Sequence, residues 1–193
     1  MRRKRKADSR IPRTRAAIRK AYLGLLGQKD AADITVTDVA QTAALDRKTI
    51  YNYYPSVSAI LEELENELVH TVDGVVHESD FSRCEGDPFG FLQAITNAFN
   101  AHDELATPLL KKNKTSHVLD KLAALISVRV DGFLGKRVEP SKRPYTKLYA
   151  DFLTSGIVSV YRDWVNAGMQ QSLEEISKQV KLLIRSGVTS FIA

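Results

Sequence analysis

Apolar residues recur along most of the chain with the three- and four-residue spacing of helices. The first helix is expected to begin at Pro12, which suits an opening helical turn, and the spacing for one helix face is found at Ile18, Tyr22, Leu25 and Leu26. Alternation typical of strands is short and local, as at residues 34–36. The pattern therefore predicts an all-α fold with about nine helices.

Polar breaks and turn residues divide this pattern into separate helices. A second helix is expected from Thr35, and a third over residues 47–53, which Pro55 helps to end. Pro108 is expected to interrupt the segment near residues 105–111. The other predicted helices follow Ser56 and then cover residues 89–102, 116–134, 145–166 and 172–191.

The second and third helices carry clear start and turn signals. Thr35 and Asp38 have the T-x-x-D spacing of a capping box, and Asp46 suits an N-cap. Residues 43–45 form a tight turn between the two helices. A helix-turn-helix holds two such helices on a small apolar core, and that core can be supplied by Val39, Leu45, Ile50 and Tyr54.

The outward faces of the third helix carry side chains suited to DNA. Ile50 and Tyr54 are four residues apart and share the inner face. Arg and Lys pair with guanine edges or phosphates, Asn binds adenine, and Thr or Tyr contacts a thymine methyl or a phosphate. A helical hairpin without DNA is the alternative, with Tyr51 and Tyr53 simply buried. We assign DNA binding to Arg47, Lys48, Thr49, Tyr51, Asn52 and Tyr53.

Positive charge is concentrated at the start of the chain. The first 20 residues hold ten Lys or Arg and one acid, a local net charge of +9, so the other 173 residues carry −4 of the total +5. A basic end on a mildly acidic body suggests a polyanion partner. DNA and anionic lipid both attract Lys and Arg, and a solubilising disordered tail is a third explanation. The charge alone does not separate these.

The stretch T-V-T-D-V-A-Q-T-A-A-L-D-R-K-T-I-Y-N-Y-Y, from Thr35 to Tyr54, resembles the signature of the TetR family. That signature joins a capped helix, a tight turn and a T-[LI]-Y-x-[HY]-[FY] recognition helix. The detailed match covers about residues 12–64, and the rest of the chain matches by helix pattern and size. The segment from Trp164 to Met169 also resembles, more weakly, the W-x-x-x-G-[MK] stretch of some family members.

The resemblance implies a homodimeric transcriptional repressor that binds a palindromic operator and is released by a small-molecule effector. It implies a basic disordered arm over residues 1–11, a helix-turn-helix DNA-binding domain over 12–54, and a ligand-binding and dimerisation domain over 55–193. Thr49 and Tyr51 match positions that usually touch DNA in the family. Tyr53 and Thr35 match positions of phosphate contacts, and helix N-termini favour such anions.

Two departures from the family pattern stand out. Ala44 replaces the glycine usual in the turn, at a cost of ~1 kcal/mol if the residue is left-handed. A lysine is often found shortly after the recognition helix, where this chain has residues 56–58, Ser-Val-Ser. The arm, through Arg3 and Arg5, would compensate for this lost phosphate contact from the minor groove or the DNA backbone.

Two features of the C-terminal half are expected from the family. Apolar stripes on the last two long helices either pack on the body or form a dimer interface, and we expect the dimer because exposed patches this large normally mark partners. The stripes comprise Leu148, Phe152, Val160, Leu173, Ile176, Val180, Leu183 and Ile184. A ligand pocket is the second feature, although ordinary core explains each of its residues at least as well. Its candidate residues are Phe91, Ile95, Phe99, Phe133, Tyr149 and Phe152.

Other function classes find little support in the sequence. No Gly-rich phosphate loop, G-x-S-x-G or H-E-x-x-H motif is present, so we predict no enzyme and no cofactor. The four histidines lack a metal-binding spacing. No apolar run reaches the ~18 residues of a membrane span, and the start is not a secretory signal. The single cysteine, Cys84, fits a reducing cytoplasm, and we expect a cytoplasmic protein.

Two further hypotheses remain beside the ligand-controlled repressor. In one, the C-terminal domain binds a protein partner instead of a small ligand, and the DNA-bound protein acts as an activator. In the other, the protein is an enzyme or a membrane-surface protein whose basic arm binds lipid.

Overall fold

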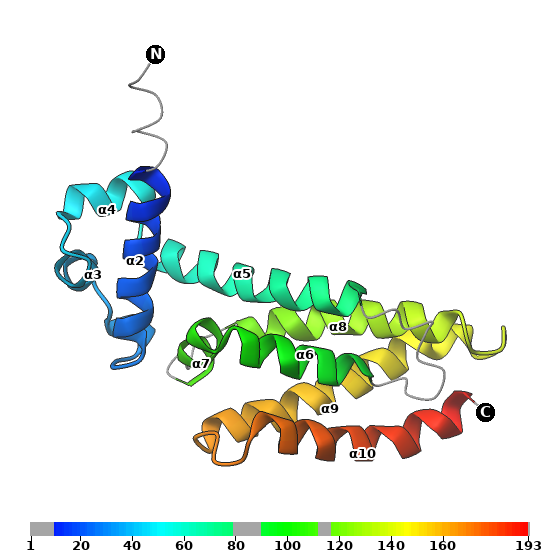
Figure 1. Ribbon diagram of the computed structural model, residues 1–193. Helices are drawn as coiled ribbons and strands as arrows, with labels where there is room; N and C mark the ends of the chain where they lie inside the picture. Colours follow the sequence, from blue (N-terminus) through cyan, green and yellow to red (C-terminus); the bar gives the residue numbers. More distant parts are fainter. Residues whose placement is uncertain (1–9, 79–89, 112–116, 193) are drawn as a thin grey trace. The chain divides into compact units, whose positions relative to one another are not determined.

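The computed structural model describes residues 10–78, 90–111 and 117–192, and the regular structure of these residues is entirely helical (Figure 1). This confirms the predicted all-α fold. The α-helices in these ranges are α2 (Arg10–Leu26), α3 (Val36–Thr42), α4 (Arg47–Tyr53), α5 (Val57–Glu78), α6 (Gly90–Ala101), α7 (Asp103–Lys111), α8 (Val118–Gly135), α9 (Thr146–Asn166) and α10 (Leu173–Ile192). Two short 3₁₀ turns accompany them, η1 (Ala31–Asp33) and η2 (Arg143–Tyr145).

The two proline predictions were wrong in detail. In the described chain α2 starts at Arg10, so Pro12 is its third residue and not its first. A proline is tolerated there because the first N–H groups of a helix have no partner within the helix. Pro108 does not interrupt its segment, because α7 runs through it from Asp103 to Lys111.

The described helices form two compact units. The first contains the chain up to Glu67 together with α7 from Glu104, and the second contains Leu68–Asp103 and the chain from His117. Helix α5 therefore contributes its first half to one unit and its second half to the other. The predicted division after residue 54 falls before α5, whereas the first unit includes eleven residues of that helix.

In the first unit, α3 and α4 share a core of buried side chains with α2 and α5. Val39 of α3 and Ile50 of α4 are fully buried, and Tyr54 is 2% exposed. Leu45, also predicted for this core, is only partly buried. Figure 1 shows α3 and α4 lying beside α2, the blue helix. The partners from α2 and α5 are the buried Ile18, Tyr22, Leu26, Ile60 and Leu64.

The second unit packs α8 on α9, and α10 on both α6 and α9 (Figure 1). A chain of hydroxyl groups crosses this core: Ser177 Oγ lies 2.7 Å from Thr96 Oγ1 and 2.8 Å from Tyr161 Oη. Thr96 also donates to the carbonyl of Leu92, 2.8 Å away. The apolar core consists of Leu92, Ile126, Val130, Phe133, Leu134, Ala150, Ile157, Val180 and Ile184.

The turn between α3 and α4 explains why the family favours glycine at residue 44. The amide of Leu45 donates to the Ala40 carbonyl at 2.9 Å, and the amide of Ala44 donates to the Gln41 carbonyl at 3.2 Å. This pair of bonds defines a Schellman motif, which requires a left-handed residue after the helix. Ala44 takes that conformation with a φ of +53°, so the condition under which alanine is costly at this position is met. The end of α9 uses the same motif with Gly168.

We predict that Ala44→Gly stabilises the first unit by up to ~1 kcal/mol, because glycine adopts a positive φ without a Cβ clash. Denaturant unfolding, followed by helical circular dichroism, measures this change. Ala43→Gly is the matched control: Ala43 has a φ of −79°, so glycine there gains nothing and destabilises the helix end. Equal destabilisation by both substitutions would contradict the prediction.

Candidate nucleic-acid interface

Helix α4 begins at a side-chain cap that Asp46 provides. The Asp46 carboxylate accepts the Thr49 amide at 2.8 Å and the Thr49 hydroxyl at 2.9 Å. These bonds, the amide first, lower the pKa of Asp46, because they favour its charged form. The predicted N-cap and the predicted helix bounds are confirmed. The Thr49 hydroxyl thus already donates its hydrogen within the cap. The groups that Thr49 presents outward are its methyl group and the lone pairs of the hydroxyl oxygen.

The outward face of α4 is polar and accessible. Arg47, Lys48 and Asn52 are exposed, and Tyr51 is 50% exposed. Residues 47 and 51, and residues 48 and 52, are four apart, so the four side chains form one continuous surface. Thr49 and Tyr53, which are also predicted DNA contacts, are half-buried at its edges. The structure therefore brings the predicted base-reading side chains together on one side of α4.

The start of α3 is organised by Asp38. Its carboxylate accepts the Thr35 amide, the Thr35 hydroxyl and the ammonium of Lys29, each at 2.7 Å. The Asp38 amide returns a bond to the Thr35 hydroxyl at 3.2 Å, which completes the predicted capping box. Lys29 and then Thr35 lower the pKa of Asp38 to about 2. The phosphate contact of Thr35 stays a prediction. The Thr35 amide and hydroxyl, which would donate to the phosphate, already donate to the Asp38 carboxylate.

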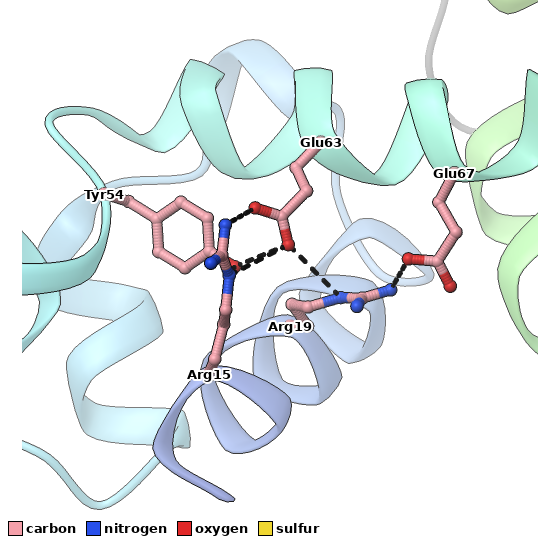
Figure 2. A network of polar contacts seen from close by, with 5 residues as sticks. All are labelled: Arg15, Arg19, Tyr54, Glu63 and Glu67. Carbon is pink, nitrogen blue, oxygen red and sulfur yellow. Dashed lines mark hydrogen bonds and ion pairs between the residues drawn. The ribbon is translucent and has the colours of Figure 1, made fainter. Parts of the chain in front are cut away.

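The basic end of the chain is partly neutralised by α5. Arg15 of α2 forms an ion pair with Glu63 of α5, and Arg19 forms one with Glu67 (Figure 2). Both arginines belong to the positive field read from the sequence, which did not reveal these partners. The available signal was a matching spacing, because the two arginines are four residues apart on α2 and the two glutamates are four residues apart on α5. Arg3 and Arg5 of the predicted arm lie outside the described residues.

The predicted ligand-pocket residues do not come together in the described structure. Phe99 and Phe133 are buried, and Ile95 packs against the core. Tyr149 and Phe152 of α9 are 38% and 76% exposed, so they line no enclosed pocket of a single chain. The buried face of the same helix is formed by other residues, which include Ala150, Ile157 and Trp164. The side chain of Phe91 lies outside the described residues.

Two other kinds of site have no counterpart in the described ranges. No group of three or more His, Cys, Asp or Glu side chains within them is arranged to hold a metal ion. Among the helices of those ranges, none is both long and apolar enough to span a membrane.

The comparison with known families decides the class of the protein. A TetR family model described as "Transcriptional regulator C-terminal region" matches residues 86–186, just over half of the chain. The chain belongs to the TetR family of transcriptional regulators. The family model covers α6 to α9 and most of α10, whereas the helix-turn-helix lies before it. This TetR-family chain is therefore a transcriptional regulator with a DNA-binding helix-turn-helix.

A curated relative and two solved structures are similar to this TetR-family chain. The relative, HTH-type transcriptional regulator YxbF of Bacillus subtilis (strain 168), is 36% identical over 58 residues, which are 30% of this chain and only 15% of that protein. A TetR regulator from Streptococcus agalactiae 2603V has a TM-score of 0.64 at 23% identity, over 92% of this chain and 97% of the other. The dihydroxyacetone kinase operon activator DhaS has a TM-score of 0.60 at 20% identity, over 92% and 97%.

Proposed function

We propose that this TetR-family chain is a sequence-specific repressor that binds a palindromic operator as a homodimer and is released by a small-molecule effector. The observation that carries the proposal is the outward face of α4, with exposed Arg47, Lys48, Tyr51 and Asn52 on a helix whose inner face is fully buried. Such a helix can enter the major groove of DNA while the rest of its unit stays outside.

The chemistry of this face suits base recognition. Arg47 and Lys48 can pair with guanine edges or with phosphates, and both stand in the first turn of α4, the end that meets base edges in helix-turn-helix proteins. Asn52 can form two hydrogen bonds with adenine. Tyr51 offers a ring for a thymine methyl. Tyr53 is assigned to the phosphate backbone, at the edge of the same face.

Repression is the simplest consequence of such binding. A protein that occupies a DNA segment excludes other proteins from it and needs no additional surface, whereas activation requires a further partner. DhaS is an operon activator, so the shared fold is compatible with activation as well as with repression. We therefore propose repression and retain activation through a protein partner as the alternative.

The proposed dimer rests on an exposed apolar face of α9 and α10. Phe152 and Leu183 are 76% and 73% exposed, which is unusual for side chains of this size. Contiguous exposed apolar patches mark interaction sites. A second copy is the fitting occupant, because two α4 helices about 34 Å apart can read both halves of a palindrome. The face comprises Leu148, Tyr149, Phe152, Val160, Leu182 and Leu183.

The proposed effector would bind in the core of the second unit. In the described ranges, Thr154 Oγ1 is the buried side-chain polar atom that has no hydrogen-bond partner, and Thr154 is 2% exposed. An unpaired buried hydroxyl destabilises the protein until something bonds to it. It lies on α9 between the core residues Ala150 and Ile157. A small molecule with one hydrogen-bonding group and an apolar body would suit this position.

Selection from a pool of randomised duplexes tests the DNA-binding proposal. We expect the wild-type protein to enrich a palindrome, with a salt dependence that corresponds to at least four neutralised phosphates. Asn52→Ala should reduce the discrimination of one base pair in each half-site by ~1–3 kcal/mol. Gln28→Ala removes an exposed amide outside α4 and should leave the preference unchanged. A shallow salt slope, or an unchanged preference in Asn52→Ala, would refute the assignment.

Charge placed in the apolar face tests the dimer. Phe152→Glu and Leu183→Glu should each convert the dimer into a monomer, because a carboxylate loses its hydration when the interface closes. Sedimentation velocity measures this change, and operator affinity should fall with it. Val128→Glu is the control, since Val128 is 67% exposed on α8, outside the face. A monomeric wild type, or dimers that tolerate both glutamates, would count against the interface.

Thr154→Val tests the effector position in two ways. Valine has the same shape without the hydroxyl, so the free protein should become more stable by about 1 kcal/mol. Small molecules are first screened for release of the wild-type protein from its selected duplex. A molecule that bonds to Thr154 should then release the valine variant only at higher concentration. Equal release of both proteins would place the effector elsewhere.

A further inference from the structure

Three helices of the first unit meet at the carboxylate of Glu63. Glu63 Oε1 accepts the Tyr54 hydroxyl at 3.0 Å and the Arg15 Nε at 3.2 Å, and Glu63 Oε2 pairs with the other end of the same guanidinium. Arg19 Nε lies 3.9 Å from Oε1. Figure 2 shows the five side chains of this network, in which α2 supplies the arginines and α5 the carboxylates.

Tyr54 connects this network to the recognition helix. It is the C-cap residue of α4, and its amide donates to the Ile50 carbonyl at 2.9 Å. Its hydroxyl accepts a bond from Arg15 Nε at 3.1 Å while it donates to Glu63, and the Arg15 guanidinium lies 5.3 Å from the centre of its ring. The end of α4 is thus tied to α2 and α5 by directional bonds in addition to apolar packing.

The contacts of Glu63 differ from those of an ordinary surface ion pair in burial and in geometry. Glu63 is three-quarters buried as a side chain, and Arg15 contacts it in a two-pronged, planar arrangement. Burial opposes the ionisation of Glu63, but the bonds from Arg15 and Tyr54 outweigh it and lower the pKa of Glu63. The same bond to Glu63, followed by that to Tyr54, raises the pKa of Arg15. Both groups therefore remain charged partners at neutral pH.

We propose that Glu63 is a positioning residue for DNA recognition: through Tyr54 and Arg15 it fixes the end of α4 relative to α2 and α5. This inference rests on the proposed sequence-specific DNA binding. Base contacts require side chains to be placed within a fraction of an ångström, whereas phosphate contacts by flexible basic side chains tolerate small displacements. Loosening the end of α4 therefore affects discrimination between sequences more than it affects general affinity for DNA.

Glu63 also lies beside two positive charges of α2. Without its carboxylate, Arg15 loses its charged partner and keeps only Tyr54, and Arg19 keeps only Glu67. Released guanidinium groups attract phosphate regardless of sequence. The loss of Glu63 therefore has a recognisable combined signature: non-specific affinity rises while the ratio of specific to non-specific affinity falls. A residue that only maintained the fold would lower both affinities together.

The experiment uses the full-length protein with two duplexes: the palindrome selected by the wild type and a scrambled duplex of the same composition. Four variants are compared with the wild type at one salt concentration. Glu63→Gln removes the charge, Tyr54→Phe removes only the hydroxyl, and Arg15→Lys keeps the charge but loses the planar fork. Glu62→Gln is the charge-matched control, an exposed acid one residue away on α5. Circular dichroism verifies that each variant is folded at the assay temperature.

We expect Glu63→Gln to raise affinity for the scrambled duplex and to lower the specificity ratio on the order of tenfold. Tyr54→Phe and Arg15→Lys should lower the ratio with little change on the scrambled duplex, because neither alters the net charge. Glu62→Gln should raise both affinities equally and leave the ratio at its wild-type value. The two charge-neutral variants keep the test informative if Glu63→Gln does not fold.

The outcomes separate this inference from the proposed function. If the wild type selects no preferred duplex, sequence-specific binding itself is overturned. If it does select one, and the folded Tyr54→Phe and Arg15→Lys variants retain the wild-type ratio, only the role of Glu63 is overturned. An equal loss of affinity on both duplexes would also overturn it, since that pattern belongs to general destabilisation.

Discussion

Helix α4 has seven residues, and a helix of that length is not stable alone in water, because its few hydrogen bonds do not offset the cost of nucleation. The proposed DNA binding depends on the surroundings that keep α4 folded. Ile50 is completely buried, the Asp46 cap fixes the first turn, and the left-handed Ala44 sets the direction of entry. These constraints occupy one face and the N-terminal end, so the remaining face is free to carry polar side chains for DNA.

Acidic side chains lie close to this basic surface, and their arrangement limits repulsion of phosphate. Asp46 bonds to the first turn of α4, Asp38 to Thr35 and Lys29, and Glu63 to Arg15. Each carboxylate is thereby committed to a cap or an ion pair inside its own unit. A carboxylate at a helix N-terminus is partly offset by the positive end of the helix dipole. These acidic side chains thus form helix caps and ion pairs, while the exposed Arg47 and Lys48 supply the positive charge of the interface.

The sequence predicted those features that depend on neighbouring residues. The caps at Thr35 and Asp46, the bounds of α4 and the left-handed Ala44 are all determined within four or five positions along the chain. The link from Arg15 to Glu63 spans 48 residues and depends on how two helices pack, so local patterns did not reveal it. The sequence placed Phe152 both among the pocket candidates and in the apolar stripe of the last two helices, because α9 has apolar residues on two faces and periodicity does not say which face is inward. For the same reason the stripe included Val180 and Ile184, which are buried.

Helix α9 has a buried and an exposed apolar face. The buried face holds Ala150 and Thr154 together with Ile157, Val158 and Trp164, whereas the exposed face holds Leu148 and Phe152. Apolar surface left in water costs roughly 25 cal/mol per Å², so large outward side chains are unfavourable in an isolated chain. The same helix would then serve the core of one chain and the contact with a second. The proposed effector position at Thr154 and the proposed dimer contact at Phe152 therefore lie on the same helix, two residues apart.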